Sequence, residues 1–177
     1  MTGVHVSEVV LREVVDGDLE DFFAHQQDPE ADRMAAFTED PADRKAFEAN
    51  WAQIRAAQDA TARTITVDGA VVGYIVSIVG DGNTSVGYSV DRAFWGRGIA
   101  SRALAQFLEQ VRTRPLFARA TKDNVGSLRV LERCGFTVID ERSGYARGRG
   151  EVVEFVVLAL RTGGAVTRVS PTAGGRG

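Results

Sequence analysis

Residues 95–101, with the sequence WGRGIAS, combine two glycines, small side chains and an arginine just before a predicted helix. The first turn of a helix carries backbone N–H groups without partners and the positive end of the helix dipole. Glycine at 96 and 98 and alanine at 100 would leave these groups with little side-chain cover. The pattern therefore predicts an anion site for a phosphate or pyrophosphate, to which Arg97 and Arg102 could add charge-assisted contacts. The alternative is a tight strand-to-helix turn that binds nothing.

The spacing of this turn does not match the common nucleotide-binding motifs. It is neither G-x-G-x-x-G nor G-x-x-x-x-G-K-[ST], and no lysine is placed to hold the terminal phosphates of a nucleotide. Asp68-Gly69, between the apolar runs 61–67 and 70–79, predicts a tight hairpin and hence antiparallel strands. A nucleotide-binding α/β domain with a parallel sheet is therefore disfavoured.

The elements that must position this turn follow from hydrophobic periodicity and turn residues. Strands are expected at 6–14, 61–67, 70–79, 84–91, 115–121, 136–141 and 151–160, and helices at 16–27, 44–57, 98–113 and 124–135. The acidic segment 28–43 is expected to be a loop with one helical turn, and 142–150 a basic, glycine-rich loop. This order predicts a mixed α+β domain, in which the passage 84–121 could hold a parallel or splayed pair of strands.

Composition limits the partners and the compartment. The chain has 177 residues and a net charge of −3, which gives no broad attraction for nucleic acid or anionic lipid. Residues 1–160 are expected to form one domain and 161–177 a flexible tail. We expect no signal peptide and no membrane span, and the single cysteine, Cys134, fits a reducing, cytoplasmic compartment. With only His5 and His25 besides, no metal site is expected.

Two motifs in this order resemble those of the GCN5-related N-acetyltransferases (GNAT). The run VGYSVDRAFWGRGIASRAL at 86–104 resembles the family's coenzyme A (CoA) signature, Q/R-x-x-G-x-G/A, with Trp95 in place of Gln or Arg. The run KDNVGSLRVLERCGF at 122–136 resembles its N-x-x-S/A…G-F element. The opening VVLREVVDGDLEDF at 9–22 is similar to the first strand and helix of the ribosomal-protein N-terminal acetyltransferase branch (RimJ/RimL type). The resemblance covers most of residues 8–160.

The resemblance implies a fold and a cofactor site. The fold would be a mostly antiparallel, splayed sheet of six to seven strands flanked by about four helices. Acetyl-CoA would be the co-substrate, with no metal. Its pantetheine arm would pair with the backbone of Tyr88, Ser89 and Val90, and would contact Asn124, for which helix capping is an alternative role. Its pyrophosphate would bind the backbone amides of the turn, which are those of Gly96, Arg97, Gly98, Ile99, Ala100 and Ser101.

The resemblance also identifies what the catalytic site lacks. The tyrosine that serves some family members as an acid is replaced by Leu131, and the glutamate that serves some as a base is replaced by Arg119. Ser127 is the remaining hydroxyl near the expected sulfur and could donate a hydrogen bond to the leaving thiolate, with a backbone-bonded helix residue as the alternative. The general base stays open between Glu39, Asp40 and water. The N–H of Val90 is the candidate donor to the carbonyl oxygen.

Two functions from different classes remain. One is an acetyl-CoA-dependent N-acetyltransferase, in which a primary amine of a small molecule or a protein N-terminus attacks the thioester directly in a ternary complex. The other is a catalytically weak or inactive CoA-binding sensor or scaffold. The first predicts thiol release from acetyl-CoA with a suitable amine, whereas the second predicts binding without turnover. A homodimer is compatible with either function.

Overall fold

The computed structural model of the protein describes residues 7–162. The predicted flexible tail therefore lies, from residue 163 onward, outside the described residues. The elements are β1 (Val9–Glu13), α1 (Asp18–Gln26), α2 (Pro29–Ala35), α3 (Arg44–Ala56), β2 (Thr61–Val67), β3 (Ala70–Gly80), β4 (Asn83–Val90), the 3-10 turn η1 (Arg92–Phe94), α4 (Ile99–Gln110), β5 (Leu116–Thr121), α5 (Val125–Arg133), β6 (Thr137–Ala146) and β7 (Glu151–Leu160).

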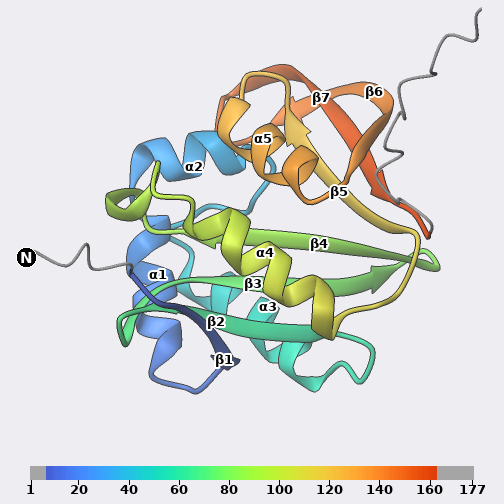
Figure 1. The fold of residues 1–177 in the computed structure, drawn as a ribbon. Coiled ribbons are helices and arrows are strands. Elements are labelled where there is room, and N and C mark those ends of the chain that lie inside the picture. Colours follow the sequence, from blue (N-terminus) through green and yellow to red (C-terminus); the bar gives the residue numbers. More distant parts are fainter. Residues whose placement is uncertain (1–6, 163–177) are drawn as a thin grey trace, which may run out of the picture.

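The seven strands form one sheet in the order β1-β2-β3-β4-β5-β7-β6 (Figure 1). All neighbouring strands are antiparallel except β4 and β5, which are parallel. A parallel pair needs a crossover connection, and α4 provides it. The predicted mixed α+β class and the mostly antiparallel sheet are confirmed.

Two Asp-Gly pairs close the central hairpins β2–β3 and β3–β4. Asp68 and Gly69 have φ angles of 50° and 84°, and Asp81 and Gly82 have φ angles of 52° and 78°. Two consecutive left-handed residues are what a tight type I′ turn requires, and glycine adopts this conformation without a steric cost. The hairpin predicted at Asp68-Gly69 is therefore present, and β3 lies between β2 and β4.

The sheet separates two apolar clusters. On one face α4 and α5 cover the sheet, with Leu104, Phe107 and Leu131 almost fully buried (Figure 1). On the other face α1 and α3 contribute Phe22 and Trp51, whose ring centroids are 5.1 Å apart. Burial of apolar surface on both faces holds β4 at the centre of the molecule, where the predicted site lies.

The structure differs from the sequence expectations in three places. Segment 28–43 contains the seven-residue helix α2, because Asp28 accepts hydrogen bonds from the N–H groups of Glu30 and Ala31. The described chain thus has five α-helices rather than about four. Residues 142–146 belong to β6 rather than to a loop, because they pair with residues 151–155 of β7. Helix α4 ends at Gln110 rather than at 113. No helix within residues 7–162 is long and apolar enough to cross a membrane.

Candidate functional site

The sheet opens between β4 and β5. The two strands pair only at Thr84–Leu116 and Ser85–Phe117. From Val86 to Val90, the edge of β4 that faces β5 therefore has no strand partner among the described residues. Unpaired backbone groups on such an edge can take an added extended chain, as strand-addition complexes do. The splay implied by the family resemblance is present.

Alternation along β4 decides which backbone groups face this opening. Asp91 N–H donates to Val72 O of β3 at 2.7 Å. Because successive residues of a strand turn their backbone groups to opposite sides, Tyr88 and Val90 face the opening and Ser89 faces β3. Of the three residues predicted to pair with the pantetheine arm, Tyr88 and Val90 are the two with backbone groups on the free edge.

Gly73 of β3 sets how closely the two strands approach at this point. A Cβ atom on Gly73 would lie 2.0 Å from the carbonyl oxygen of Ser89, a distance that no side chain can adopt. Only glycine therefore allows β4 to follow this path toward the site. The sequence gives no sign of this role, because the contact depends on the register between β3 and β4.

The glycine turn leads from β4 into α4. Gly96 and Gly98 have φ angles of 76° and 73°, and a Cβ atom at either position would meet nothing within 4 Å. The first N–H group that bonds within the helix is that of Arg102, which donates to Gly98 O at 3.1 Å. The four N–H groups from Gly98 to Ser101 therefore have no helical partner, as the first turn of any helix requires. This is the bare helix start that the sequence predicted.

The side chains around the turn brace it rather than point to a ligand. Arg102 donates to the carbonyl oxygens of Ser7, Arg97 and Gly98. Arg97 lies over the ring of Phe94, with 5.2 Å between Cζ and the ring centroid. Both arginines thus have contacts within the protein, and whether they also contact the cofactor stays a prediction. The hydroxyl of Ser101 is buried and has no hydrogen-bond partner within residues 7–162.

Trp95, which replaces the Gln or Arg of the family motif, ties the turn to β4. Its indole Nε1–H donates to Val90 O at 2.7 Å. This bond uses the carbonyl of Val90 and leaves its N–H group toward the opening. Trp95 therefore has a structural role of its own at the position where the family motif has Gln or Arg.

The opposite wall of the opening is the start of α5. Asn124 caps this helix, because its Oδ1 accepts a hydrogen bond from Ser127 N–H at 3.2 Å. The capping role is therefore present, and the side-chain NH2 group has no partner among residues 7–162, so it can still donate to a ligand. Ser127 Oγ lies 2.8 Å from the hydroxyl of Tyr88, which reaches across from β4. Burial raises the pKa of Tyr88 to about 12, although the hydrogen bond with Ser127 opposes this rise.

The positions at which some family members carry an acid and a base have structural roles here. Leu131 is buried in the core under α5. The guanidinium of Arg119 lies over the ring of Phe37, 5.1 Å from its centroid. The candidate bases Glu39 and Asp40 lie in the connection between α2 and α3, where Asp40 accepts a hydrogen bond from Ala42 N–H. Within residues 7–162 no hydrogen bond or ion pair links Glu39 or Asp40 to Tyr88, Asn124 or Ser127.

The turn between β6 and β7 fastens the α2 segment to this end of the sheet. Gly148 N–H donates to Ala36 O at 2.8 Å, and a Cβ atom on Gly148 would lie 2.5 Å from Asp32 O. Arg147 forms an ion pair with Asp32 and donates to Thr38 O. The basic residues at 147–149 thus hold a neighbouring part of the chain, which the sequence could not indicate.

Arg149 extends this connection to α5. Its guanidinium is 4% exposed and forms two hydrogen bonds with the Asp123 carboxylate, at 2.6 and 2.9 Å. It also donates to the carbonyl oxygen of Arg33 in α2. The hydrogen bonds from Arg149 lower the pKa of Asp123 to about 2. Because Asp123 precedes Asn124, one arginine links α2, the β6–β7 turn and the start of α5. We call the contacts of residues 147–149 with 32–38 and Asp123 the arginine bridge.

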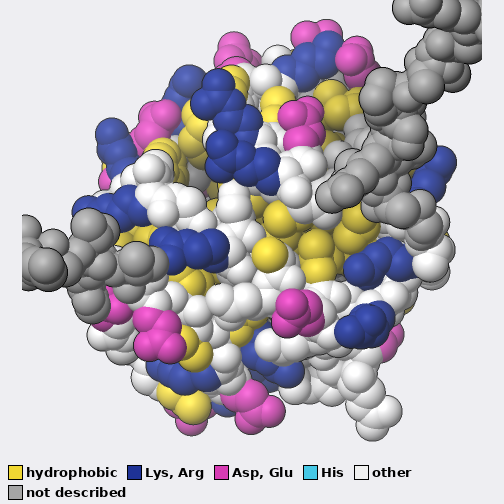
Figure 2. Space-filling model, viewed as in Figure 1, with side chains coloured by type: hydrophobic (Ala, Val, Ile, Leu, Met, Phe, Trp, Pro, Cys, Tyr) yellow, Lys and Arg dark blue, Asp and Glu magenta, His cyan; other side chains and the backbone are white. Residues whose placement is uncertain are grey.

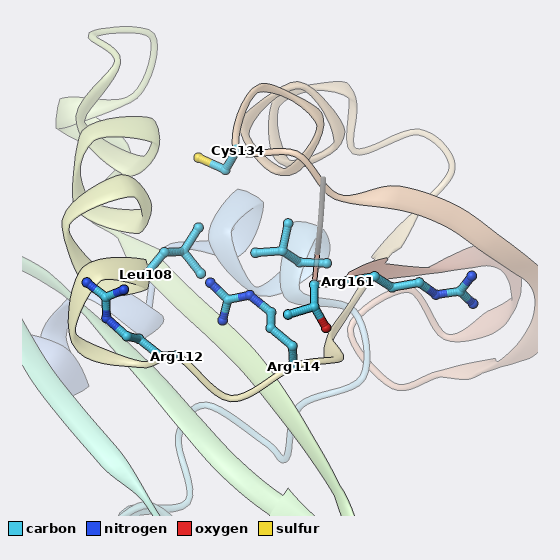
Figure 3. A pocket seen from close by; sticks show the side chains of 7 residues that line it. Leu108, Arg112, Arg114, Cys134 and Arg161 are labelled. Atoms are coloured by element: carbon cyan, nitrogen blue, oxygen red, sulfur yellow. The ribbon is translucent and has the colours of Figure 1, made fainter. Parts of the chain in front are cut away.

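A pocket of about 400 Å³ lies elsewhere, near the C-terminal end of α4. Its lining includes Leu108, Arg112, Arg114 and Cys134 (Figure 3). Figure 2 shows apolar side chains on this face between α4, α5 and the start of β5. None of the residues predicted to bind CoA lines this cavity. No cluster of three or more potential metal ligands occurs within residues 7–162.

A sheet that opens beside a bare helix start is the architecture of an acetyltransferase that binds CoA by its backbone. The family of GNAT acetyltransferase domains matches residues 8–137 of this sequence. The chain belongs to the GNAT acetyltransferase family, whose acyl donor is acetyl-CoA. No match to the sequence was found among curated proteins.

Solved structures show the same fold. The spermidine N-acetyltransferase from Vibrio cholerae in complex with CoA and spermine is 14% identical, with a TM-score of 0.71, and the match covers 85% of this chain and 95% of that one. RimJ of Mycobacterium smegmatis in complex with CoA-disulfide is 21% identical, with a TM-score of 0.69 and coverage of 85% and 81%. The microcin C7 self-immunity acetyltransferase MccE, in complex with acetyl-CoA and AMP, is 17% identical, with a TM-score of 0.70 and coverage of 87% and 92%. These similarities concern the fold.

Proposed function

We propose that this protein is an acetyl-CoA-dependent N-acetyltransferase that acts on a primary amine. The observation that carries the proposal is the row of N–H groups from Gly98 to Ser101, which lies beside the unpaired edge of β4. These groups fit a pyrophosphate by charge and by geometry, because a helix start binds anions through its N–H groups and its dipole. Gly96 and Gly98 leave the approach to them open.

The remaining residues of the site would divide the work around a bound thioester. The backbone of Tyr88 and Val90 would pair with the pantetheine arm, and the NH2 group of Asn124 would hold its polar groups. The free N–H group of Val90 is the proposed donor to the carbonyl oxygen on which charge develops. Ser127 would stabilise the departing thiolate. With no acidic side chain bonded into the site, we propose that water accepts the amine proton and that positioning supplies much of the rate.

The acceptor would be a primary amine of a small molecule or of a protein N-terminus. The names of the structural relatives include both kinds, a spermidine N-acetyltransferase and a ribosomal-protein-S18-alanine N-acetyltransferase. The balance of 21 basic and 24 acidic residues supports a free amine rather than a nucleic acid as the partner. The single cysteine supports the expected cytoplasmic compartment.

The test combines binding with turnover. Calorimetry should detect binding of acetyl-CoA, and a thiol reagent should detect CoA release when polyamines, amino acids or N-terminal peptides are added. Thiol release that depends on one class of amine would identify the acceptor. Binding without release across the whole panel would favour the sensor function, which the structural roles of Leu131 and Arg119 keep open. A folded protein that does not bind acetyl-CoA would contradict both.

A further inference from the structure

Two hydroxyl groups meet inside the opening between β4 and β5. Tyr88 Oη lies 2.8 Å from Ser127 Oγ and 3.4 Å from the carbonyl oxygen of Ser127. Tyr88 comes from the wall formed by β4, and Ser127 comes from the first turn of α5. The pair therefore spans the two elements that border the opening, at the place where the proposed function puts the sulfur of CoA.

We infer that Tyr88 is a positioning residue. Its phenol donates a hydrogen bond to Ser127 Oγ, and the hydroxyl hydrogen of Ser127 is thereby directed to the sulfur of CoA. This inference rests on the proposed function, because it concerns the sulfur of the donor. A hydroxyl group has one hydrogen to donate and two lone pairs to accept. Once Ser127 accepts from Tyr88, its own hydrogen is free to bond to another acceptor, and no other side-chain partner of Ser127 Oγ is found within residues 7–162.

Burial keeps Tyr88 in the donating form. Burial raises the pKa of Tyr88 to about 12, and the nearby thiol of Cys134 contributes in the same direction. The phenol therefore stays protonated throughout the pH range in which an amine acceptor is neutral enough to react. A neutral phenol can donate to Ser127, whereas a phenolate would accept from it and remove the hydrogen that Ser127 would offer to sulfur.

The energetics favour hydrogen bonding over proton transfer. An ordinary cysteine thiol has a pKa of about 8.5, well below the pKa of Tyr88, which burial raises to about 12. Transfer of the Tyr88 proton to the thiolate would therefore be uphill. As the C–N bond forms and the C–S bond breaks, the sulfur takes the bonding electron pair and leaves as a thiolate, which accepts the hydrogen bond from Ser127. The proton lost by the amine nitrogen passes to water.

The site needs a hydrogen-bond donor to the leaving thiolate, because the position that carries a tyrosine in some family members offers none. Leu131 stands where some family members place a tyrosine, and it is 1% exposed in the core. Tyr88 instead supplies a phenol from β4, and the hydroxyl of Ser127 would lie between this phenol and the sulfur. The pair would thus supply thiolate stabilisation by a different route.

The direct test measures the pKa of the thiol of bound CoA by thiolate absorbance, with no acetyl transfer required. The Cys134→Ala background removes the one thiol of the protein. A hydrogen bond to the thiolate lowers its pKa, so Ser127→Ala should raise the pKa of bound CoA by about one unit. Tyr88→Phe should raise it by a smaller amount, and the double variant no more than Ser127→Ala. Ser127→Thr, which keeps the hydroxyl, should restore the original value.

Tyr74→Phe is the matched control. Tyr74 is a buried tyrosine on the adjacent strand β3, its pKa is also raised by burial, and its ring packs against Trp51 on the other face of the sheet. Loss of its hydroxyl should leave the pKa of bound CoA unchanged. Turnover provides the second readout. Ser127→Ala should lower kcat about tenfold and Tyr88→Phe by less, both with little change in the affinity for acetyl-CoA.

The outcomes separate this inference from the proposed function. If CoA binds but Tyr88→Phe does not shift the pKa of its thiol, the inference is wrong and the proposed function stands. If the folded wild-type protein does not bind CoA, the proposed function itself is wrong. Should Tyr88→Phe fail to fold, Tyr88→Leu tests the same loss of the phenol hydroxyl in its place.

Discussion

The two sides of the β4–β5 opening are built in different ways. On the side of the glycine turn, the exposed groups are backbone N–H groups from Gly98 to Ser101, and they depend on a few residues close together in the sequence. On the side of α2, the arginine bridge joins residues 32–38, 123 and 147–149 through charged side chains. The first region is open to a ligand, whereas the second is crosslinked to its neighbours.

This difference corresponds to two tasks, binding of the common donor acetyl-CoA and binding of a particular acceptor. Any acetyl-CoA molecule presents the same pyrophosphate, so a bare helix start serves every acceptor. The acceptor differs between enzymes, and we propose that it binds on the side of the arginine bridge, where side-chain contacts between distant segments shape the surface. We therefore expect changes at the turn to affect CoA binding, and changes in the arginine bridge to affect stability and acceptor use.

The largest effect is expected at Gly98. Gly98→Glu places a negative charge and a bulky side chain over the N–H groups, at a φ angle of 73° that is strained for a non-glycine residue. The affinity for acetyl-CoA, measured by calorimetry, should fall more than 100-fold. Gly98→Asn is the matched control, because asparagine tolerates the left-handed conformation and adds no charge, and it should bind within a few-fold of wild type. Unchanged affinity in folded Gly98→Glu would contradict the site.

Removal of the arginine bridge should separate the two regions. Arg149→Ala removes two hydrogen bonds to Asp123 and one to the carbonyl oxygen of Arg33, and we expect the free energy of unfolding to fall by about 2 kcal/mol. The KM for the acceptor should rise, while the Kd for CoA stays within about twofold. Arg112→Ala, which removes an exposed arginine that forms no ion pair within residues 7–162, should change neither. Equal losses in CoA affinity and acceptor use would show that the two regions are not independent.

The contribution of this bridge should depend on pH in a defined direction. The hydrogen bonds from Arg149 hold the pKa of Asp123 at about 2, below its ordinary value. A lowered carboxyl pKa stabilises the folded state above the unfolded pKa of about 4, and this contribution is lost as the pH falls toward 2. The difference in unfolding free energy between wild type and Arg149→Ala should therefore narrow from pH 4 to pH 2 in urea titrations. Other carboxylates with a lowered pKa, such as Asp18, titrate in both proteins and largely cancel in the difference.

A smaller effect is expected at Trp95. Trp95→Phe keeps an aromatic ring but removes the Nε1–H bond to Val90 O, which costs about 1 kcal/mol. Since this bond braces the turn, the Kd for acetyl-CoA should rise two- to five-fold with little change in acceptor KM. Tyr145→Phe is a control that alters an exposed aromatic residue on β6 and leaves this bond in place. A rise in the acceptor KM with no change in the Kd for acetyl-CoA would contradict the assignment of Trp95 to the CoA-binding turn.

Much of the fold was predictable because its signals are local. Asp-Gly pairs set the hairpins, apolar spacing marked α3, α4 and α5, and glycine at 96 and 98 marked the helix start. The helix α2 was missed because its cap depends on one aspartate in an acidic, proline-containing segment that looks like a loop. The strand residues 142–146 were missed because arginine and glycine rarely mark a strand, and here the pairing with β7 stabilises it.

The candidate site was predictable in part for the same reason. Gly98 was marked by the local glycine pattern, whereas Asn124 and Ser127 were proposed from the family resemblance, and their roles stay predictions. The roles of Gly73, of Trp95 as a brace and of the phenol of Tyr88 were not predicted. Each of these depends on an atom that another segment brings within contact distance, such as Ser89 O for Gly73. Sequence spacing carries no information on that distance.

The sequence by itself determined the open helix start, since glycine conformations and helix ends depend on neighbours within a few residues. Only the tertiary structure decided that Arg147 and Arg149 hold α2 and Asp123 rather than a ligand. It also decided that Tyr88 meets Ser127 across the opening. The physical reason is the distance along the sequence over which each interaction acts. Backbone conformation depends on neighbouring residues, whereas the hydrogen bond between Tyr88 and Ser127, 39 residues apart, can form only once the fold brings the two side chains together.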